Sequence, residues 1–582
     1  MTTQPQLATA EFSFRTRRQN IARLKAETFD ILVIGGGITG AGIARDAALR
    51  GFSTALVEKG DFASGTSSKS SKLIHGGIRY LENFEFGLVF EASQERRRLR
   101  KIAPHLVKPL PFLMPIYRSS KRGYWLIRAG MWLYDILALF RNVQRHRMLR
   151  PEAVAASEPE VDQRDLAGAA RFYDCQVDDA RLTLATILDA SRYGAVVTNY
   201  TQVVALLKDG GKVVGAQVRD VLSGEEFAAH ARVTINATGV WVDEIQRLDD
   251  PRTVPQLRPT KGIHILVPRE KFNNRHAIAF TSPADGRLMF LVPWGRYALI
   301  GTTDTDYQGD LDRVYAESQD VQYVLEAVNS AFPTVKLTRD DIVSTFAGTR
   351  PLISEQIASS YKVSREHKIF DSPSGLLSIA GGKLTTYRAM AEQMVDLAEK
   401  RLQRAFGRKP PHGCCTDKRC LDPGDVRKVE ADLSPRPSPG RGGEGGEVDN
   451  EVMCHLVATF GTDYTRLLEL VATGSRTLDD SDGGRARTRQ GNDRLGQRIV
   501  ADLPYIWAEV PYAVRQEMAM TLSDVLARRT HLLYEDRQQG LGVAEPVANL
   551  MAQDLGWGPD EVARQVAAYR QEVELTRLYQ KT

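Results

Sequence analysis

The amino-acid sequence predicts an α/β fold that ends in a helical C-terminal domain. Three observations indicate it. A strand, a glycine-rich turn, a helix and a second strand follow one another near the N-terminus, short strand-like segments recur in the middle of the chain, and amphipathic helical segments prevail after about residue 411. At 582 residues the chain is long enough for about three or four domain-sized units.

The stretch Phe29–Glu58 provides the first observation. An apolar run, Ile31–Ile34, leads into the pattern Gly-x-Gly-x-x-Gly, a helical pattern follows, and a second apolar run, Thr54–Val57, ends at Glu58. This order of strand, glycine turn, helix, strand and acid is typical of a Rossmann-like dinucleotide-binding unit.

Four residues of this unit have expected roles in binding a dinucleotide. Gly35 permits the tight turn, Gly37 lets the backbone approach a pyrophosphate at the helix N-terminus, and Gly40 allows close packing of helix on strand. Glu58 lies 23 residues after Gly35, where its carboxylate can accept hydrogen bonds from ribose hydroxyls and would repel a 2′-phosphate. We therefore expect a bound dinucleotide without that phosphate.

The middle of the chain carries short strand-like segments separated by turns. They predict an antiparallel sheet interleaved with the nucleotide-binding domain, so that residues 29–405 form one composite unit. The segments are Val196–Leu207, Val213–Arg219, Arg232–Ala237, Ile263–Val267, Leu288–Pro293 and Tyr297–Thr302.

Two further glycine signals accompany these strands. In one, a strand runs into Ala237 and Gly239, and in the other a strand runs into Gly382 and a helix opens with Lys383 and Thr385. A helix start offers unpaired backbone N–H groups to an anion or to the polar edge of a ring. Both signals predict further contacts with the nucleotide.

The two ends of the chain differ in character from its middle. Residues 1–28 are polar, carry no apolar core of a secretory signal, and are expected to be a mobile or loosely docked extension. Residues 411–582 predict a helical domain. Within it, Ser434–Glu447 is rich in proline, glycine and serine and is expected to be a disordered insertion, and Asp479–Arg494 is similar.

Composition and charge exclude several classes of protein. The formal net charge is +5, and the basic residues are scattered rather than massed, so we expect no nucleic-acid partner. Five cysteines, an odd and sparse set, are typical of a reducing compartment. The cluster HGCCTDKRC (residues 412–420) matches no common zinc spacing, so we expect no metal.

Two segments are rich in basic residues. Phe84–Ile102 has helical spacing and ends in arginines and lysine, which we interpret as a solvated helix end. Arg118–Arg147 combines tryptophan, tyrosine and leucine with flanking basic residues, and Arg128 and Asp135 interrupt it, so it should not span a membrane. It fits either an amphipathic segment on an anionic membrane surface or a buried helix pair with basic ends.

A set of motifs resembles a known family. GGGITGAGIARDAALRG, GTSSKSSKLIHGGIRYLE, DDARL, NATG, KGIHIL, GTTDTDY, GTRPL and GGKLTTYR together resemble FAD-dependent glycerol-3-phosphate dehydrogenase, from about residue 29 to the helical C-terminal region. The longer N-terminal extension and the Ser434–Glu447 insertion depart from the family pattern, and neither touches a catalytic motif.

The resemblance implies an FAD-binding Rossmann-like domain interleaved with an antiparallel-sheet substrate domain. It implies oxidation of sn-glycerol 3-phosphate to dihydroxyacetone phosphate, with the C2 hydride passed to FAD and the electrons then passed to ubiquinone of the respiratory chain. Because ubiquinone is lipid-soluble, we expect a cytoplasmic protein attached peripherally to the inner face of the cytoplasmic membrane. A homodimer is possible, and the sequence leaves the oligomeric state open.

The resemblance also assigns catalytic residues. Arg79 and Arg350 follow turn-like, glycine-containing stretches and are expected to clamp the substrate phosphate, because a guanidinium offers parallel N–H donors to phosphate oxygens. His264 is expected to contact the substrate hydroxyl and to act as a general base. Tyr80 is expected in the substrate wall, Lys383 near the flavin pyrimidine or the substrate, and Thr385 at either ligand.

The remaining site residues are expected to hold FAD. They come from the glycine turn, the hydroxyl-rich stretch that follows it, and the two later glycine signals. They are Gly35, Gly37, Gly40, Glu58, Thr66, Ser67, Ser68, Ser71, Lys72, Leu73, His75, Gly76, Gly77, Ala237, Gly239, Gly382, Lys383, Leu384 and Thr385.

Three alternatives to a quinone-linked dehydrogenase stay open. A glycerol-3-phosphate oxidase would use O₂ and give hydrogen peroxide from the same substrate. An amino-acid or amine oxidase could share the fold, although the paired arginines argue against it. A non-enzymatic flavoprotein would lack the complete set of substrate-type residues found here.

Overall fold

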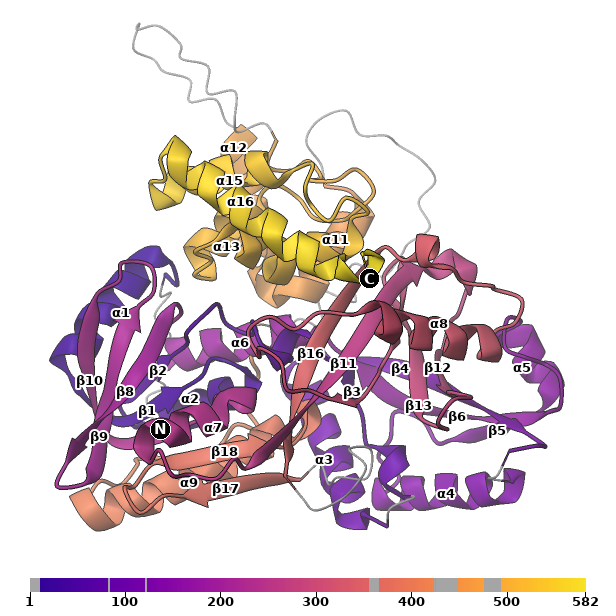
Figure 1. Cartoon of the computed structure of the whole chain (residues 1–582), viewed down its shortest axis with the longest axis horizontal. Coiled ribbons are helices and arrows are strands. Elements are labelled where there is room, and N and C mark those ends of the chain that lie inside the picture. Colours follow the sequence, from indigo (N-terminus) through magenta and orange to yellow (C-terminus); the bar gives the residue numbers. More distant parts are fainter. Residues whose placement is uncertain are drawn as a thin grey trace, which may run out of the picture.

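The computed structural model describes residues 11–81, 84–120, 123–354, 366–422, 424, 448–475 and 494–581. The predicted insertion Ser434–Glu447, and all of Asp479–Arg494 except its last residue, lie outside them. Figure 1 shows two sheet-based parts side by side, with the helical C-terminal domain packed across their upper edge.

The first sheet contains the predicted dinucleotide-binding unit. Its strand order is β17-β18-β10-β1-β2-β7, β1 runs parallel to both β10 and β2, and the antiparallel pair β8–β9 joins it through β10. Its strands are β1 (Thr28–Ile34), β2 (Thr54–Val57), β7 (Val196–Thr198), β8 (Thr201–Asp209), β9 (Lys212–Asp220), β10 (Glu226–Asn236), β17 (His367–Asp371) and β18 (Leu377–Gly381).

Successive side chains of β1 enter two different cores. Ile31 and Val33 pack with residues of α2 (Ile38–Arg50), α6 (Asp179–Arg192) and α9 (Tyr387–Phe406), whereas Leu32 and Ile34 pack with α1 (Phe14–Ala26), β8 and β9. Because both faces are covered, the strand is apolar along most of its length, as a central parallel strand should be.

Helix α1 is bound firmly to the first sheet. Arg17 is 4% exposed, donates from Nε to the Asn199 carbonyl oxygen at 3.0 Å, and forms an ion pair with Asp220. Asn20 Nδ2 donates to the Val197 carbonyl oxygen at 2.8 Å. Residues 11–28 therefore differ from the loosely docked extension that their polar composition suggests, because their arginine and asparagine satisfy buried backbone oxygens.

The second sheet has the order β15-β11-β14-β13-β12-β4-β6-β3, with β16 paired to β11 and β5 to β6. Its pairs are antiparallel except for β4 with β12. Its strands are β3 (Leu73–Ile74), β4 (Lys108–Tyr117), β5 (Arg147–Leu149), β6 (Leu166–Gln176), β11 (Leu257–Pro268), β12 (Ala277–Thr281), β13 (Leu288–Trp294), β14 (Tyr297–Gly301), β15 (Thr305–Asp306) and β16 (Ser344–Ile353).

Three of the six strand predictions differ from the structure. Arg232–Ala237 is predicted in the antiparallel sheet, but it lies in β10, parallel to β1 in the first sheet. Val213–Arg219 lies in β9, and Val196–Leu207 in β7 and β8, which also belong to the first sheet. The latter segment divides around Tyr200, whose φ is +51°. The assignment to one sheet or the other is not visible in the sequence, because buried parallel and antiparallel strands share the same apolar residues.

Helices cover the outer faces of the second sheet. α8 (Ser318–Ala331) packs on one face, and the C-terminal domain contributes to the core on the other. α3 (Phe86–Ile102) and α4 (Tyr124–Leu137) lie along the lower edge in Figure 1. Shorter helices are α5 (Pro151–Ser157) and α7 (Val242–Asp249). In the described part of the chain, no helix is both long enough and apolar enough to cross a bilayer.

The predicted helical C-terminal domain is confirmed. It contains α11 (Asn450–Phe460), α12 (Tyr464–Ser475), α13 (Glu509–Gln516), the π-helix η9 (Asp524–Arg529), α14 (Leu532–Glu535), α15 (Ala544–Leu555) and α16 (Pro559–Thr576). Within the residues that the structure describes, no group of three or more His, Cys, Asp or Glu side chains could hold a metal ion.

Candidate active site

A cavity of about 280 Å³ lies where the first loop after β2 meets β11, β16 and the start of α9. Thirteen of the predicted site residues line it: Thr66, Ser67, Ser71, Leu73, His75, Gly77, Tyr80, His264, Arg350, Gly382, Lys383, Leu384 and Thr385. The side chain of Arg79, the other expected phosphate ligand, lies outside what the structure describes.

The glycine turn between β1 and α2 has the close contacts that its glycines require. Gly35 has φ +110°, and a Cβ there would lie 2.7 Å from the Ala237 carbonyl oxygen. A Cβ at Gly40 would overlap the Gly35 carbonyl oxygen. Gly239, which follows Ala237, has φ +62°. These residues shape the end of the β1–β10 pair rather than the cavity.

Two features of this turn fit a dinucleotide. Glu58 accepts hydrogen bonds from the backbone N–H groups of Gly36 at 2.6 Å and Gly60 at 2.8 Å, which fix its carboxylate at the end of β2. The Ser67 hydroxyl accepts from the Ile38 N–H at 2.9 Å, so it stands at the N-terminus of α2, where a phosphate is expected.

The hydroxyl-rich stretch after the turn is tied to three other elements. The Thr66 hydroxyl donates to the Thr349 carbonyl oxygen of β16 at 2.7 Å, and Ser71 Oγ contacts His264 Nε2 of β11 at 2.9 Å. Lys72 Nζ pairs with Asp179 of α6 at 2.6 Å and lies outside the cavity lining, as do Ser68 and Gly76. Lys72 therefore anchors the loop instead of facing the cavity.

His264 lies on β11, 3% exposed, with its ring stacked on Phe346 at a centroid distance of 4.9 Å. Burial, reinforced by the positive charges of Arg350 and Lys72, lowers the pKa of His264 to about 3. The imidazole is therefore neutral at physiological pH and can accept a proton.

Arg350 reaches into the same cavity from β16. Its Nη1 pairs with Asp304 at 3.1 Å, and its Nη2 donates to Thr302 Oγ1 at 2.9 Å and to the Thr303 carbonyl oxygen at 3.1 Å. These contacts hold the guanidinium beside Gly262, where a Cβ would overlap Nη2.

The register of β11 and β16 places Arg350 and His264 at two ends of one surface. Gly262 pairs with Gly348, and His264 pairs with Phe346 two residues further along. Residues directly opposite in an antiparallel pair, and residues two apart on a strand, share a face of the sheet. The two facing glycines therefore let other side chains lie directly over the strands: a Cβ at Gly262 would overlap Arg350 Nη2, and one at Gly348 would lie 2.7 Å from Lys69 Cβ.

Three more predicted residues lie close together on another wall. Lys383 Nζ stands 3.6 Å from the centroid of the Tyr80 ring. The Thr385 hydroxyl accepts from the His75 N–H at 3.2 Å and lies 3.3 Å from the His75 carbonyl oxygen. These contacts join residues 75–80, which include the start of η2 (Ile78–Leu81), to residues 383–385 at η7 (Leu384–Thr386), which leads into α9.

Sequence reasoning missed several polar groups at the site. Thr302 and Asp304 belong to the motif GTTDTDY, which the sequence analysis singled out without giving these residues a task. Arg287 lines the cavity as a further cation. Asp174 accepts from the Gly76 N–H at 3.0 Å and pairs with Arg96, whose burial at 3% exposure differs from the solvated helix end expected for this run.

Comparisons with known proteins agree with this arrangement. Residues 30–397 match the family model described as FAD dependent oxidoreductase, and residues 414–562 match the C-terminal domain of alpha-glycerophosphate oxidase. A glycerol-3-phosphate dehydrogenase of Mycobacterium leprae is 40% identical over 565 residues, covering 96% of this chain and 90% of that protein. The chain belongs to the FAD-dependent glycerol-3-phosphate dehydrogenase family.

Other relatives support the same family and fold. The aerobic glycerol-3-phosphate dehydrogenase of Staphylococcus aureus is 36% identical, with 96% of each chain covered. The structure of the glycerol-3-phosphate dehydrogenase of Bacillus halodurans complexed with FAD covers 97% of this chain and 98% of that one, at 32% identity and a TM-score of 0.76. The expected fold class and FAD as the cofactor are thereby confirmed.

Proposed function

We propose that this chain oxidises sn-glycerol 3-phosphate to dihydroxyacetone phosphate with FAD and passes the electrons to ubiquinone. The observation that supports it most is that Arg350 and His264 line one cavity, with the Arg350 guanidinium over Gly262, two residues from His264 on β11. A phosphorylated alcohol needs a cation for its phosphate and a proton acceptor for its hydroxyl, and the cavity contains one candidate for each. FAD, when bound, supplies the hydride acceptor.

Arg350 is the proposed ligand of the substrate phosphate. Asp304 and Thr302 orient its guanidinium, and an oriented guanidinium can bind a phosphate through two parallel hydrogen bonds. The resemblance to the family implies Arg79 as the second arginine at the phosphate, and Arg79 is part of the proposal. Tyr80, next to Arg79 in the chain and 5% exposed, would form the adjoining wall.

His264 is the proposed acceptor of the proton on the C2 hydroxyl. It is neutral in the free protein because burial and the nearby charges of Arg350 and Lys72 lower its pKa. A phosphate dianion bound to Arg350 would offset that positive charge and raise the pKa of His264, so substrate binding would strengthen the base. Ser71 Oγ, at 2.9 Å from Nε2, would orient the ring.

Each part of FAD has a proposed contact. Glu58 would accept from the adenosine ribose, and the first turn of α2, with Ser67, would receive the pyrophosphate. Lys383 would place a positive charge by the flavin ring and Thr385 a hydroxyl, which favours a reduced, anionic ring.

The test of the substrate assignment is turnover with a soluble redox dye. We expect activity with sn-glycerol 3-phosphate and little with glycerol, and we expect Arg350→Lys to raise KM for the phosphorylated substrate by about a hundredfold. Equal activity with glycerol, or an unchanged KM in Arg350→Lys, would contradict the proposal. Oxygen consumption in place of quinone reduction would identify the oxidase reaction instead.

Attachment to the inner face of the cytoplasmic membrane is part of the proposal, because ubiquinone is dissolved in the bilayer. Helices α3 and α4 lie near each other (Figure 1). Large apolar side chains are exposed at and just before the start of α3, and along and just after α4: Phe84, Phe86, Phe90, Trp125, Leu126, Trp132, Ile136, Leu139 and Phe140. Exposed basic residues accompany them at Arg118, Arg128 and Arg145. Apolar and aromatic side chains bordered by cations suit an anionic membrane surface.

A further inference from the structure

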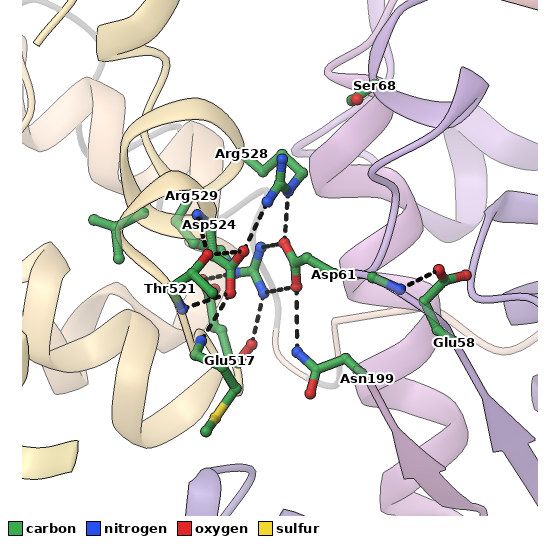
Figure 2. Close-up of polar contacts among 12 residues, drawn as sticks. Glu58, Asp61, Ser68, Asn199, Glu517, Thr521, Asp524, Arg528 and Arg529 are labelled. Carbon is green, nitrogen blue, oxygen red and sulfur yellow. Dashed lines mark hydrogen bonds and ion pairs between the residues drawn. The ribbon is translucent and has the colours of Figure 1, made fainter. Parts of the chain in front are cut away.

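The C-terminal domain meets the dinucleotide-binding domain at a buried carboxylate. Asp61 is 1% exposed and lies in the turn that follows β2, three residues after Glu58. Arg529 binds both of its oxygens, at 2.7 and 2.9 Å, and Arg528 Nε binds Oδ2 at 2.6 Å. Figure 2 shows both guanidinium groups reaching from the C-terminal domain to this turn.

The two arginines are themselves held in place within the C-terminal domain. Arg529 Nη2 donates to the Glu517 carbonyl oxygen at 2.9 Å, and Arg528 Nη2 pairs with Asp524 at 2.7 Å. Both arginines belong to the π-helix η9, a rare geometry that recurs at functional positions. Contacts within the C-terminal domain therefore hold both arginines in addition to their contacts with Asp61.

The charge balance makes Asp61 depend on these arginines. Burial by itself would raise the pKa of Asp61, but the charges of Arg529 and Arg528 outweigh burial and lower it. Asn199 Nδ2, at 3.4 Å from Oδ1, is a further donor to this carboxylate, but it is neutral. A buried carboxylate without a cationic partner is strongly unfavourable, so the place of Asp61 depends on the two arginines.

The same turn fixes Glu58. Gly60 donates its N–H to Glu58 Oε1 at 2.8 Å, and the Gly60 carbonyl oxygen accepts from the Tyr200 N–H at 2.9 Å. Figure 2 shows Glu58 and Asp61 close together, with the C-terminal arginines on the Asp61 side. A shift of Asp61 would move Gly60 and, with it, one of the two backbone donors that orient the Glu58 carboxylate.

We propose that Arg528 and Arg529 are positioning residues for FAD: through Asp61 they set the turn that presents Glu58 to the adenosine ribose. The inference rests on the proposed place of Glu58 at that ribose. It gives the C-terminal domain a role in cofactor affinity. Within the part of the chain that the structure describes, no residue of this domain lines the cavity itself.

The test is FAD binding to the full-length apoprotein, followed by quenching of flavin fluorescence. Arg529→Lys keeps the positive charge but cannot bind both oxygens of Asp61 through parallel hydrogen bonds. Asp61→Asn removes the negative charge of the carboxylate. We expect each to raise the Kd for FAD about tenfold and the Kd for ADP, which carries only the adenosine half, by the same factor. The double variant should be little worse than either single variant, because both changes break one contact.

The matched control is Arg192→Lys. Arg192 joins α6 to Asp463 of the C-terminal domain at 2.8 Å and donates to the Leu421 carbonyl oxygen at 3.1 Å. None of these contacts involves Asp61 or Glu517, the residue that holds Arg529. Arg192→Lys should lower the melting temperature of the apoprotein, because it also breaks an ion pair between the two domains, and leave the Kd values for FAD and ADP near those of the parent. An equal loss of FAD affinity in Arg192→Lys, or an unchanged Kd in Arg529→Lys, would overturn the inference.

A further variant separates this inference from its premise. Glu58→Gln should itself weaken ADP binding. If it does and Arg529→Lys does not, the C-terminal domain has no positioning role. If Glu58→Gln leaves ADP binding unchanged, the premise fails and the inference fails with it.

Discussion

The Arg350 guanidinium lies over the backbone of Gly262, on the neighbouring strand, in the space that a Cβ at residue 262 would fill. Such a Cβ would also lie 2.6 Å from Thr302 Oγ1, a partner of Arg350. The absence of a side chain at residue 262 is thus what lets the Arg350 guanidinium lie close to the β11 backbone.

Gly262→Ala is expected to displace Arg350 and to spare the fold. The atoms in the way are the far end of a flexible side chain and a hydroxyl, so the protein can fold by moving them, but the phosphate ligand then leaves its position. We expect KM for sn-glycerol 3-phosphate to rise by about tenfold or more, with FAD content unchanged.

Gly87→Ala is the matched control for that variant, because a Cβ there meets nothing within 4 Å. It should leave KM unchanged. A Gly262→Ala protein with the parental KM would show that the substrate does not use Arg350 in the position described here.

His264→Gln is expected to slow flavin reduction by about 10²- to 10⁴-fold, because a glutamine cannot accept the hydroxyl proton. Binding of the substrate should change little, since Arg350 is untouched. Stopped-flow absorbance separates the two effects: the limiting rate should fall while the half-saturating concentration stays similar. A limiting rate within a few-fold of the parent would exclude His264 as the proton acceptor.

In the protein without substrate, His264 should stay neutral at pH values well below those at which a histidine usually becomes protonated. Burial lowers its pKa from 6.5 to about 3, so its protonation is not complete until the pH falls below that value. The Cε1 NMR signal of His264, assigned by its loss in His264→Gln, should not titrate between pH 8 and 5. Titration near pH 6.5 would mean that the ring is solvated.

The lowered pKa of His264 also makes the stability of the folded protein depend on pH. Between pH 6.5 and 3, His264 is protonated in the unfolded chain but stays neutral in the folded protein. Protonation therefore favours the unfolded chain, and His264 lowers the free energy of unfolding progressively as the pH falls from 6.5 towards 3. The parent should therefore lose stability relative to His264→Gln by about 2 kcal/mol between pH 7 and pH 5. A pH-independent difference would contradict the lowered pKa.

Membrane attachment should depend on the apolar side chains of α4. Trp125 is 72% exposed and Leu126 64%, so replacing both with serine removes apolar surface without opening the core. We expect the double variant to leave anionic phospholipid vesicles in a flotation assay and to keep its activity with a soluble dye. Val254→Ser, at a side chain 71% exposed elsewhere, should stay bound. Equal release of both variants would refute α4 as the anchor.

The dinucleotide-binding unit was predictable from the sequence because its constraints are local. A tight turn requires Gly35, close packing of helix on strand requires Gly40, and Glu58 supplies a carboxylate that backbone N–H groups hold. All three lie within 24 residues of one another. His264 and Arg350 were predicted from motifs, and the structure adds Gly262, over which the Arg350 guanidinium lies. That relation depends on strand register, which no single segment reveals.

Other parts could not be predicted, for a physical reason. Asp61 and Arg529 are 468 residues apart, and a buried ion pair at that separation leaves no periodic pattern in either segment. Arg17 and Arg96 look like solvated surface cations in the sequence, yet each is buried because a carboxylate from a distant element meets it. Their burial depends on tertiary partners rather than on local composition.

The most direct measurement of the central claim is anaerobic flavin absorbance, before and after addition of sn-glycerol 3-phosphate. We predict rapid bleaching in the parent protein, and no bleaching at the same substrate concentration in Arg350→Ala with FAD bound. A ubiquinone analogue should then restore the oxidised spectrum. A bound flavin that stays oxidised in the parent would contradict the substrate assignment and leave only the FAD-binding fold.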